Sequence, residues 1–163
     1  MLMLEAIALI QEENDLAVHF VHQTGIADED RVRGGYGAAG MEAEVAPFFK
    51  DMASLYKKAD LVVARAGATT LAELSVMGLP ALLIPYPYAA DDHQGKNGSY
   101  YVKGGGARMY REAELDAKLL ASAIIELLQS PDELHSMAAQ MKKMGKPDAT
   151  SRILDDCLKL VGV

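Results

Sequence analysis

The sequence predicts an α/β fold: a doubly wound parallel sheet that lacks its usual first strand. Three observations support this prediction. Apolar runs typical of buried strands alternate along the chain with stretches of helical periodicity. The stretches between the predicted strands are long enough to form the crossover helices that parallel strands need. The alternation begins with a helix, although a doubly wound sheet normally begins with its central strand and a phosphate-binding turn.

The individual elements follow from these patterns in chain order. The stretch 16–22 alternates and is rich in strand-forming residues, whereas 61–64 and 81–84 are continuous apolar runs. Ser130 followed by Pro131 is typical of a helix start. The expected strands are 16–22, 44–48, 61–64, 81–84 and 107–110. The expected helices are 2–11, 28–39, 52–58, 70–77, 93–102, 116–129, 131–144 and 148–161.

Composition bounds the class of protein. We expect one domain spanning 1–163 and closing with helices at about 116–161. The 16 basic and 23 acidic residues give a net charge of −7 without a basic stripe, which excludes a general nucleic-acid binder. The single cysteine, Cys157, excludes an intrachain disulfide, and no Cys/His cluster suits zinc. Cys157 lies on the apolar side of the last predicted helix, which predicts a buried thiol. The absence of a signal peptide or membrane span favours the cytoplasm.

The missing first strand leaves a gap at the centre of the predicted sheet. Unpaired backbone groups in such a gap are costly when they are buried. We therefore expect either that strands 16–22 and 61–64 pair directly, or that a second copy of the chain closes the gap and makes a homodimer.

The segment Gly35–Gly40 matches the letters of the dinucleotide-binding fingerprint. That motif is meaningful only where it directly follows a strand and opens a helix. Here it follows the charged, helical stretch 28–33, so we do not interpret it as a nucleotide site.

The segment 64–73 is better placed to bind an anion. It follows the apolar run 61–64, turns through Gly67 and enters a helix, which presents backbone amides to a phosphate without any lysine. The alternative is that Thr70 and Glu73 form an ordinary capping box and bind nothing. Spacing alone leaves both interpretations open.

A polar cluster of Asp91, Asp92, His93 and Gln94 follows the apolar run 81–84. Four adjacent residues that enter a helix rarely converge on one ion, so we expect no metal site there. At the carboxyl end of a parallel strand, a polar contact to a bound ligand is the better interpretation. No set of nucleophile, base and orienting residue is visible.

Several motifs resemble those of the MurG family, in the same order and with similar spacing from about residue 15 onward. They are His22–Gly25, Pro47–Met52, Asp60–Glu73, Gly78–Ala81, Pro85–Pro87, Ala89–Gln94 and Gly145–Ala149. MurG-like enzymes are two-domain glycosyltransferases of the GT-B architecture. The resemblance is to their C-terminal, Rossmann-like half, which binds the sugar nucleotide; the first strand and the glycine-rich phosphate loop of that half are not matched.

This resemblance implies a site for UDP-N-acetylglucosamine. The backbone of Phe49 would meet uracil, with Met52 close to the base. Glu73 would accept hydrogen bonds from the ribose hydroxyls, and Gln94 would contact the hydroxyls of the sugar. The residues implied at the diphosphate are Ala68, Thr69, Thr70, Leu71 and Ala72. The further neighbours implied are His93 and Asn97.

By the same resemblance, the chain is the donor-binding half of an enzyme that adds N-acetylglucosamine to lipid I, making lipid II for peptidoglycan. The resemblance implies no cofactor and no metal. The N-terminal domain that binds lipid I is not matched, so we expect the catalytic base to lie outside this chain and the chain alone to be inactive. The full-length enzyme would be peripheral on the inner face of the cell membrane.

Two alternatives stay open on the sequence. The chain could be a nucleotide-sugar-binding subunit that becomes a transferase only with a separate partner chain, or a non-catalytic module.

Overall fold

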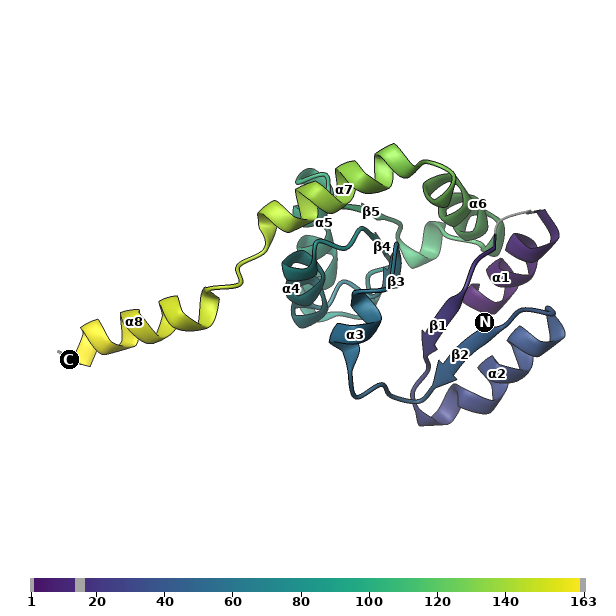
Figure 1. Cartoon of the computed structure of the whole chain (residues 1–163), viewed down its shortest axis with the longest axis horizontal. Coiled ribbons are helices and arrows are strands. Elements are labelled where there is room, and N and C mark those ends of the chain that lie inside the picture. The colour runs from purple at the N-terminus through teal and green to yellow at the C-terminus, as the bar shows by residue number, and fades with distance from the viewer. Residues whose placement is uncertain (1, 14–16, 162–163) are drawn as a thin grey trace. The chain divides into compact units, whose positions relative to one another are not determined.

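The computed structural model describes residues 2–13 and 17–161. The packing groups the chain into two compact units, which we describe separately (Figure 1). Unit 1 comprises Met1–Ala59 and Tyr110–Leu134, and unit 2 comprises Asp60–Met109 and His135–Val163. That the 163 residues form a single UDP-sugar-binding domain stays a prediction.

Unit 1 is built around a pair of parallel strands. Its elements are α1 (Leu2–Glu13), β1 (Phe20–Gln23), the 3-10 helix η1 (Ile26–Asp28), α2 (Glu29–Ala38), β2 (Ala43–Ala46), α3 (Met52–Tyr56), the 3-10 helix η3 (Glu112–Glu114) and α6 (Ala117–Leu128). β1 pairs with β2 so that Phe20 lies opposite Ala43. The strand predicted at 16–22 is thus shorter, and its first residue lies outside the described residues.

The core of unit 1 joins its helices to these strands. Ile7 of α1, Val32 and Tyr36 of α2 and Val45 of β2 are buried against one another. α6 packs along α1, and its Leu120 is almost fully buried. The helical periodicity of these segments therefore marked the sides that face the core.

α2 runs through most of the glycine-rich segment. Gly35 lies inside α2, where an added Cβ would sit 2.8 Å from Leu4 Cδ1. This glycine therefore allows α1 and α2 to approach closely. The segment does not follow a strand, which confirms that it lacks the setting of a dinucleotide-binding turn.

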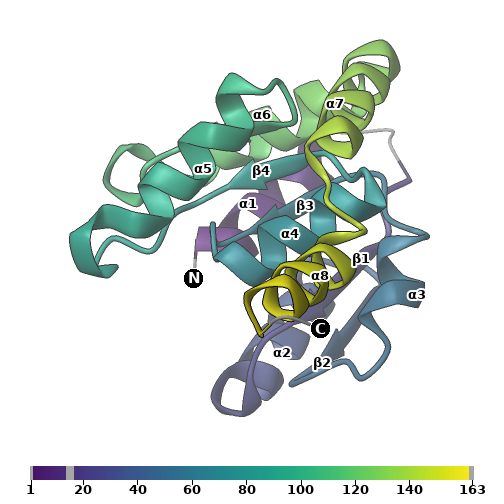
Figure 2. The ribbon, with the colours of Figure 1, turned by 90° about the vertical axis from the view of Figure 1, so that its left-hand side faces the viewer.

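Unit 2 is a three-stranded parallel sheet with helices. Its elements are β3 (Val62–Ala64), α4 (Ala68–Met77), β4 (Ala81–Leu83), the 3-10 helix η2 (Ala90–Asp92), α5 (His93–Lys103), β5 (Ala107–Met109), α7 (Pro131–Met144, whose first turn is grouped with unit 1) and α8 (Ala149–Val161). The strand order is β3-β4-β5, and Figure 2 shows β3 and β4 side by side. The central strand β4 is fully buried, whereas β3, at the edge of this sheet, is only half-buried.

The described strands confirm the predicted parallel pairing, but direct pairing of the strands predicted at 16–22 and 61–64 is wrong. Among the described strands β1 pairs with β2 and β3 pairs with β4, in two separate sheets. β1 and β3 each have a parallel partner within their own unit, which satisfies the backbone groups along one edge of each strand.

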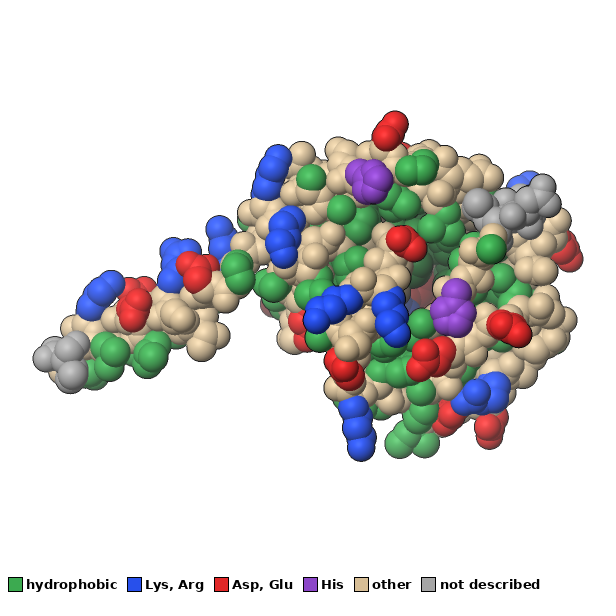
Figure 3. Space-filling view, viewed as in Figure 1, with side chains coloured by type: hydrophobic (Ala, Val, Ile, Leu, Met, Phe, Trp, Pro, Cys, Tyr) green, Lys and Arg blue, Asp and Glu red, His purple; other side chains and the backbone are tan. Residues whose placement is uncertain are grey.

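The last helix corrects the prediction for Cys157. The amphipathic pattern predicted the helix itself, which runs over Ala149–Val161. None of its described side chains is buried, however, and Cys157 is exposed. Apolar side chains lie along one side of α8 (Figure 3). Ile153 of this helix is 65% exposed. An apolar stripe shows which side a helix can bury, but burial also requires a surface to pack against.

Candidate functional site

The loop between β3 and α4 ends at Gly67, the N-cap of α4. Gly67 is extended (φ −70°, ψ 141°), and the helix begins at Ala68, before the predicted start at Thr70. The first amides of a helix have no carbonyl one turn earlier to bond, and here they belong to Ala68, Thr69 and Thr70. The amide of Leu71 donates to the Gly67 carbonyl oxygen at 3.0 Å. The helix start therefore directs N–H groups and the positive end of its dipole toward an anion.

The residues predicted at the diphosphate do not share one face of α4. Ala68, Thr69 and Ala72 are exposed, and so is Glu73. Leu71 is 1% exposed, and its side chain belongs to the buried core. Thr69 and Glu73 lie one turn apart, so the exposed carboxylate and the helix start lie on the same side of the helix.

The capping-box alternative for Thr70 and Glu73 is wrong. A capping box needs its threonine at the N-cap position. Here the N-cap is Gly67, which has no side chain, and Thr70 already lies inside the helix. The residues that match the capping-box spacing therefore begin after the actual N-cap of α4.

The start of α4 is supported by α5. Asn97 Nδ2 donates to the carbonyl oxygen of Ala66 at 3.4 Å, and Ala66 is fully buried. A Cβ added at Gly98 would lie 3.4 Å from Ala66 Cβ and 2.6 Å from Met109 Sδ. Asn97, expected only as a neighbour of the ligand, thus also holds the loop that precedes α4.

Arg65 ties this loop to the one that follows β4, and sequence analysis did not single it out. Its Nη1 donates to the carbonyl oxygens of Ile84 and Pro85, each at 3.2 Å. Its guanidinium also lies 5.7 Å from the centre of the Tyr86 ring. An arginine directly after a strand, at the edge where ligands bind in parallel sheets, is the feature that could have indicated it.

Gln94 lies beside the same loop. Its Oε1 accepts a hydrogen bond from the backbone N–H of Tyr86 at 2.9 Å. The oxygen is therefore engaged with the protein, and the Nε2 group is the part of the amide suited to donate to a ligand hydroxyl.

The rest of the predicted polar cluster bends the chain into α5. Asp91 and Asp92 have positive φ angles of 49° and 52°, an uncommon conformation for residues other than glycine. His93 Nδ1 lies 2.8 Å from the carbonyl oxygen of Ala90, within its own turn. Across residues 2–13 and 17–161, no three His, Cys, Asp or Glu side chains are grouped as a metal site.

Phe49 and Met52, the residues expected at the base, belong to unit 1. The amide of Phe49 donates to Gln23 Oε1 at 3.1 Å, so its backbone N–H is already engaged. Met52 is half-buried and opens α3, whose N-cap is Asp51. Hydrogen bonds from the Ser54 side chain and backbone hold the pKa of the Asp51 carboxyl below its ordinary value.

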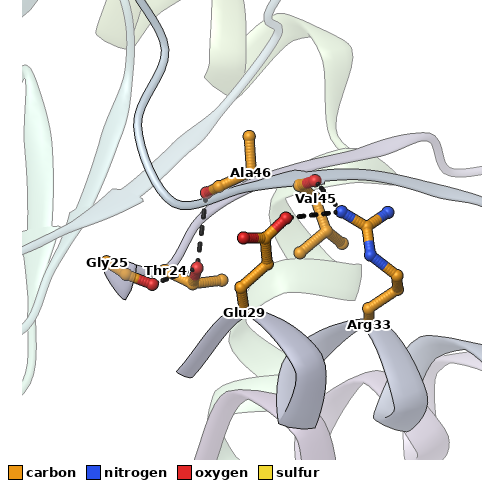
Figure 4. Close-up of polar contacts among 6 residues, drawn as sticks. All are labelled: Thr24, Gly25, Glu29, Arg33, Val45 and Ala46. Atoms are coloured by element: carbon orange, nitrogen blue, oxygen red, sulfur yellow. Dashed lines mark hydrogen bonds and ion pairs between the residues drawn. The ribbon is translucent and has the colours of Figure 1, made fainter. Parts of the chain in front are cut away.

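Polar contacts also join α2 to the two strands of unit 1. Arg33 Nη2 donates to the Val45 carbonyl oxygen at 2.7 Å and to Glu29 Oε1 at 2.8 Å (Figure 4). His22 Nδ1 and the Tyr36 hydroxyl lie 3.2 Å apart. Burial lowers the pKa of His22 and raises the pKa of Tyr36.

An open cavity of about 470 Å³ lies beside β2. Its lining residues are His19, Arg33, Tyr36, Gly37, Met41, Glu42, Ala43, Glu44 and Val45. None of the predicted site residues is among them. A well-formed pocket is a common ligand site, but here the predicted residues and their chemistry indicate the exposed start of α4 instead.

Comparison with known proteins identifies the family. The profile of the glycosyltransferase family 28 C-terminal domain matches residues 2–153. A protein from Desulfotalea psychrophila, named UDP-N-acetylglucosamine--N-acetylmuramyl-(pentapeptide) pyrophosphoryl-undecaprenol N-acetylglucosamine transferase, is 42% identical over 160 residues, which is 98% of this chain and 43% of that protein. A protein of the same name from Myxococcus xanthus is 46% identical over 159 residues, which is 98% of this chain and 41% of that protein. The chain thus spans less than half the length of these relatives.

Solved structures agree on the fold. The crystal structure of MurG from Acinetobacter baumannii matches with a TM-score of 0.85 at 29% identity, over 94% of this chain and 44% of that one. The glycosyltransferase VinC, solved with dTDP, matches with a TM-score of 0.62 at 18% identity, over 87% of this chain and 32% of that one. The predicted fold class, the Rossmann-like C-terminal half of a GT-B fold, is therefore confirmed. The chain belongs to glycosyltransferase family 28, in which it corresponds to the C-terminal domain.

Proposed function

We propose that the chain is the donor-binding half of a transferase that moves N-acetylglucosamine from UDP-N-acetylglucosamine to lipid I, producing lipid II for peptidoglycan. The observation that carries the proposal is the start of α4, where Ala68, Thr69 and Thr70 open a helix directly after a parallel strand. The names of the relatives from Desulfotalea psychrophila and Myxococcus xanthus supply the donor and the acceptor.

The start of α4 suits a diphosphate. Backbone amides and the helix dipole offset phosphate charge without a metal ion. During transfer the leaving UDP gains negative charge, so the same amides stabilise the transition state more than the bound donor. Of the five residues implied at the diphosphate, Ala68, Thr69 and Thr70 would donate through the backbone, whereas Leu71 anchors the helix in the core.

The remaining donor contacts are assigned to four side chains or backbone groups. Glu73, exposed on α4, would accept hydrogen bonds from the ribose diol. Gln94 would donate to a sugar hydroxyl through Nε2, because its Oε1 is engaged with Tyr86. In unit 1 the carbonyl of Phe49 would accept from the uracil N3–H, since the amide is engaged with Gln23. Met52 would lie near the base.

The parts of the reaction outside this chain belong to the proposal as well. The chain covers 43% and 41% of the length of the two relatives. We assign lipid I binding and the catalytic base to an N-terminal acceptor domain. A peripheral place on the inner face of the cell membrane follows from the acceptor; no described helix is both long and apolar enough to span a membrane.

Two features of the proposal concern partners. A nucleotide-sugar-binding subunit completed by a separate partner chain is the alternative to a continuous two-domain enzyme. A homodimer through the strand edges of β1 or β3 stays a prediction, since neither edge finds a partner among the described strands.

The test is a calorimetric titration of the chain with UDP-N-acetylglucosamine. Glu73→Ala should weaken binding by about 1–3 kcal/mol, because the ribose hydroxyls would lose their acceptor. Asp155→Ala removes an exposed carboxylate from α8 of the same unit and should leave the dissociation constant unchanged. An unchanged dissociation constant for Glu73→Ala would remove the ribose assignment.

An assay of lipid II formation distinguishes a continuous two-domain enzyme from a subunit that needs a separate partner chain. We expect donor binding but no lipid II formation by the chain alone, because catalysis requires both substrates to be held together. Activity that returns only with a separately expressed partner would favour the subunit alternative.

A further inference from the structure

Two exposed tyrosines follow β4 at the edge of the sheet where parallel α/β folds bind ligands. Tyr86 is 45% exposed and Tyr88 is 82% exposed. Their rings pack edge to face, with centroids 5.6 Å apart and planes at 71°. Large aromatic side chains at such an edge offer a rigid apolar surface beside polar contacts, which is the composition of most small-molecule sites.

Tyr86 is held in place from two sides. The Arg65 guanidinium lies 5.7 Å from its ring centre and is itself bonded to the carbonyl oxygens of Ile84 and Pro85. Its backbone N–H donates to Gln94 Oε1 at 2.9 Å. Tyr86 therefore supports the ring of Tyr88. The side-chain amide of Gln94, which is assigned to the sugar hydroxyls, contacts the backbone of Tyr86.

The chemistry of a hexosamine complements this pair. The hydroxyls of a glucose-configured ring point outward around its rim, and its two faces consist of C–H bonds. Those hydrogens carry partial positive charge, and the face of a tyrosine ring carries the negative part of its quadrupole. A site that recognises such a sugar therefore needs hydrogen-bonding groups at the rim and an aromatic surface against one face.

We propose that Tyr88, supported by Tyr86, forms the wall against which the ring of the transferred hexosamine packs. The inference rests on the proposed donor-binding function and adds to it a contact with the sugar face. Gln94 then contacts the rim of the ring while Tyr88 covers its face, and neither group touches the nucleotide.

The experiment compares two ligands that differ only by the sugar. Dissociation constants for UDP and for UDP-N-acetylglucosamine are measured by calorimetry on the unsubstituted chain and on Tyr88→Ala and Tyr88→Phe. Tyr88→Ala should bind UDP-N-acetylglucosamine about three- to tenfold more weakly, the range expected for an aromatic contact, and should bind UDP unchanged. Tyr88→Phe should behave as the unsubstituted chain, because the wall uses the ring rather than the hydroxyl.

Tyr100→Ala is the matched control. Tyr100 is 60% exposed and packs edge to face on Tyr101, with centroids 5.3 Å apart, but it lies inside α5 rather than at the sheet edge. Its removal should change neither dissociation constant. Thermal unfolding of each variant verifies the fold, which the loss of a side chain as exposed as Tyr88 should leave intact.

The outcomes distinguish the inference from the proposed function. If Tyr88→Ala binds UDP-N-acetylglucosamine as tightly as the unsubstituted chain does, the proposed contact with the sugar face is wrong. It is also wrong if Tyr88→Ala loses the same affinity for UDP as for UDP-N-acetylglucosamine. If the unsubstituted chain binds no UDP at millimolar concentration, the donor-binding function fails, and the wall fails with it.

Discussion

Replacing Gly145 by alanine tests how closely the end of α7 packs against α4. Gly145 follows the last residue of α7, and an added Cβ would lie 2.6 Å from the carbonyl oxygen of Ser75 and 3.1 Å from the Cα of Val76. Both contacts are with backbone atoms of α4, so no side-chain rotation can relieve them. Lys142 adds a hydrogen bond from Nζ to the Val76 carbonyl oxygen, so the end of α7 is fastened at this place.

The expected loss of stability follows from these distances. Forcing one extra carbon into a well-packed site typically costs about 1–3 kcal/mol. Alanine also restricts the unfolded chain, which offsets about 0.4–1 kcal/mol of that cost. We therefore expect Gly145→Ala to lower the free energy of unfolding by about 1–2 kcal/mol.

Urea unfolding followed by circular dichroism measures this difference, and Gly34→Ala is its control. Gly34 lies in the middle of α2, where an added Cβ would meet nothing within 4 Å beyond its chain neighbours and the backbone of its own helix. The same substitution there should raise the free energy of unfolding by about 0.5–1 kcal/mol, because alanine favours a helix. Gly145→Ala as stable as the unsubstituted chain would refute the close contact between α7 and α4.

Two further predictions concern protonation in unit 1. Burial holds the pKa of His22 below its ordinary value, so below about pH 6.5 the unfolded chain binds a proton that the folded chain resists. The contribution of neutral His22 to stability should therefore be present above about pH 6.5 and be lost as the pH falls from there toward the folded pKa. Urea unfolding at pH 7.5 and pH 5 measures this loss, and His22→Gln should make it smaller. A loss of the same size in His22→Gln would mean that other groups cause it. Ser54→Ala should raise the pKa of the Asp51 carboxyl in an NMR titration, because it removes the hydroxyl that donates to Asp51 Oδ2; an unchanged pKa would contradict that hydrogen bond.

Much of the candidate site could be predicted because it depends on local order along the chain. An apolar run, a glycine turn and a helix at 61–77 place amides at the end of a strand whatever the rest of the protein does. The contacts that complete the site join residues distant in sequence. Gln23 engages the amide of Phe49, and Arg65 reaches the loop after β4. Neither partnership leaves a periodic pattern, so sequence analysis missed both.

Three features could be predicted from the sequence alone: the order of strands and helices along the chain, their parallel pairing, and the membership of a glycosyltransferase family. Periodicity and capping are local properties, so they survive without knowledge of the fold. The tertiary structure alone showed that β1 and β3 belong to separate sheets and that Cys157 is exposed. Each of these depends on what surface lies opposite, because backbone pairing and burial require a partner that the pattern of one segment cannot specify.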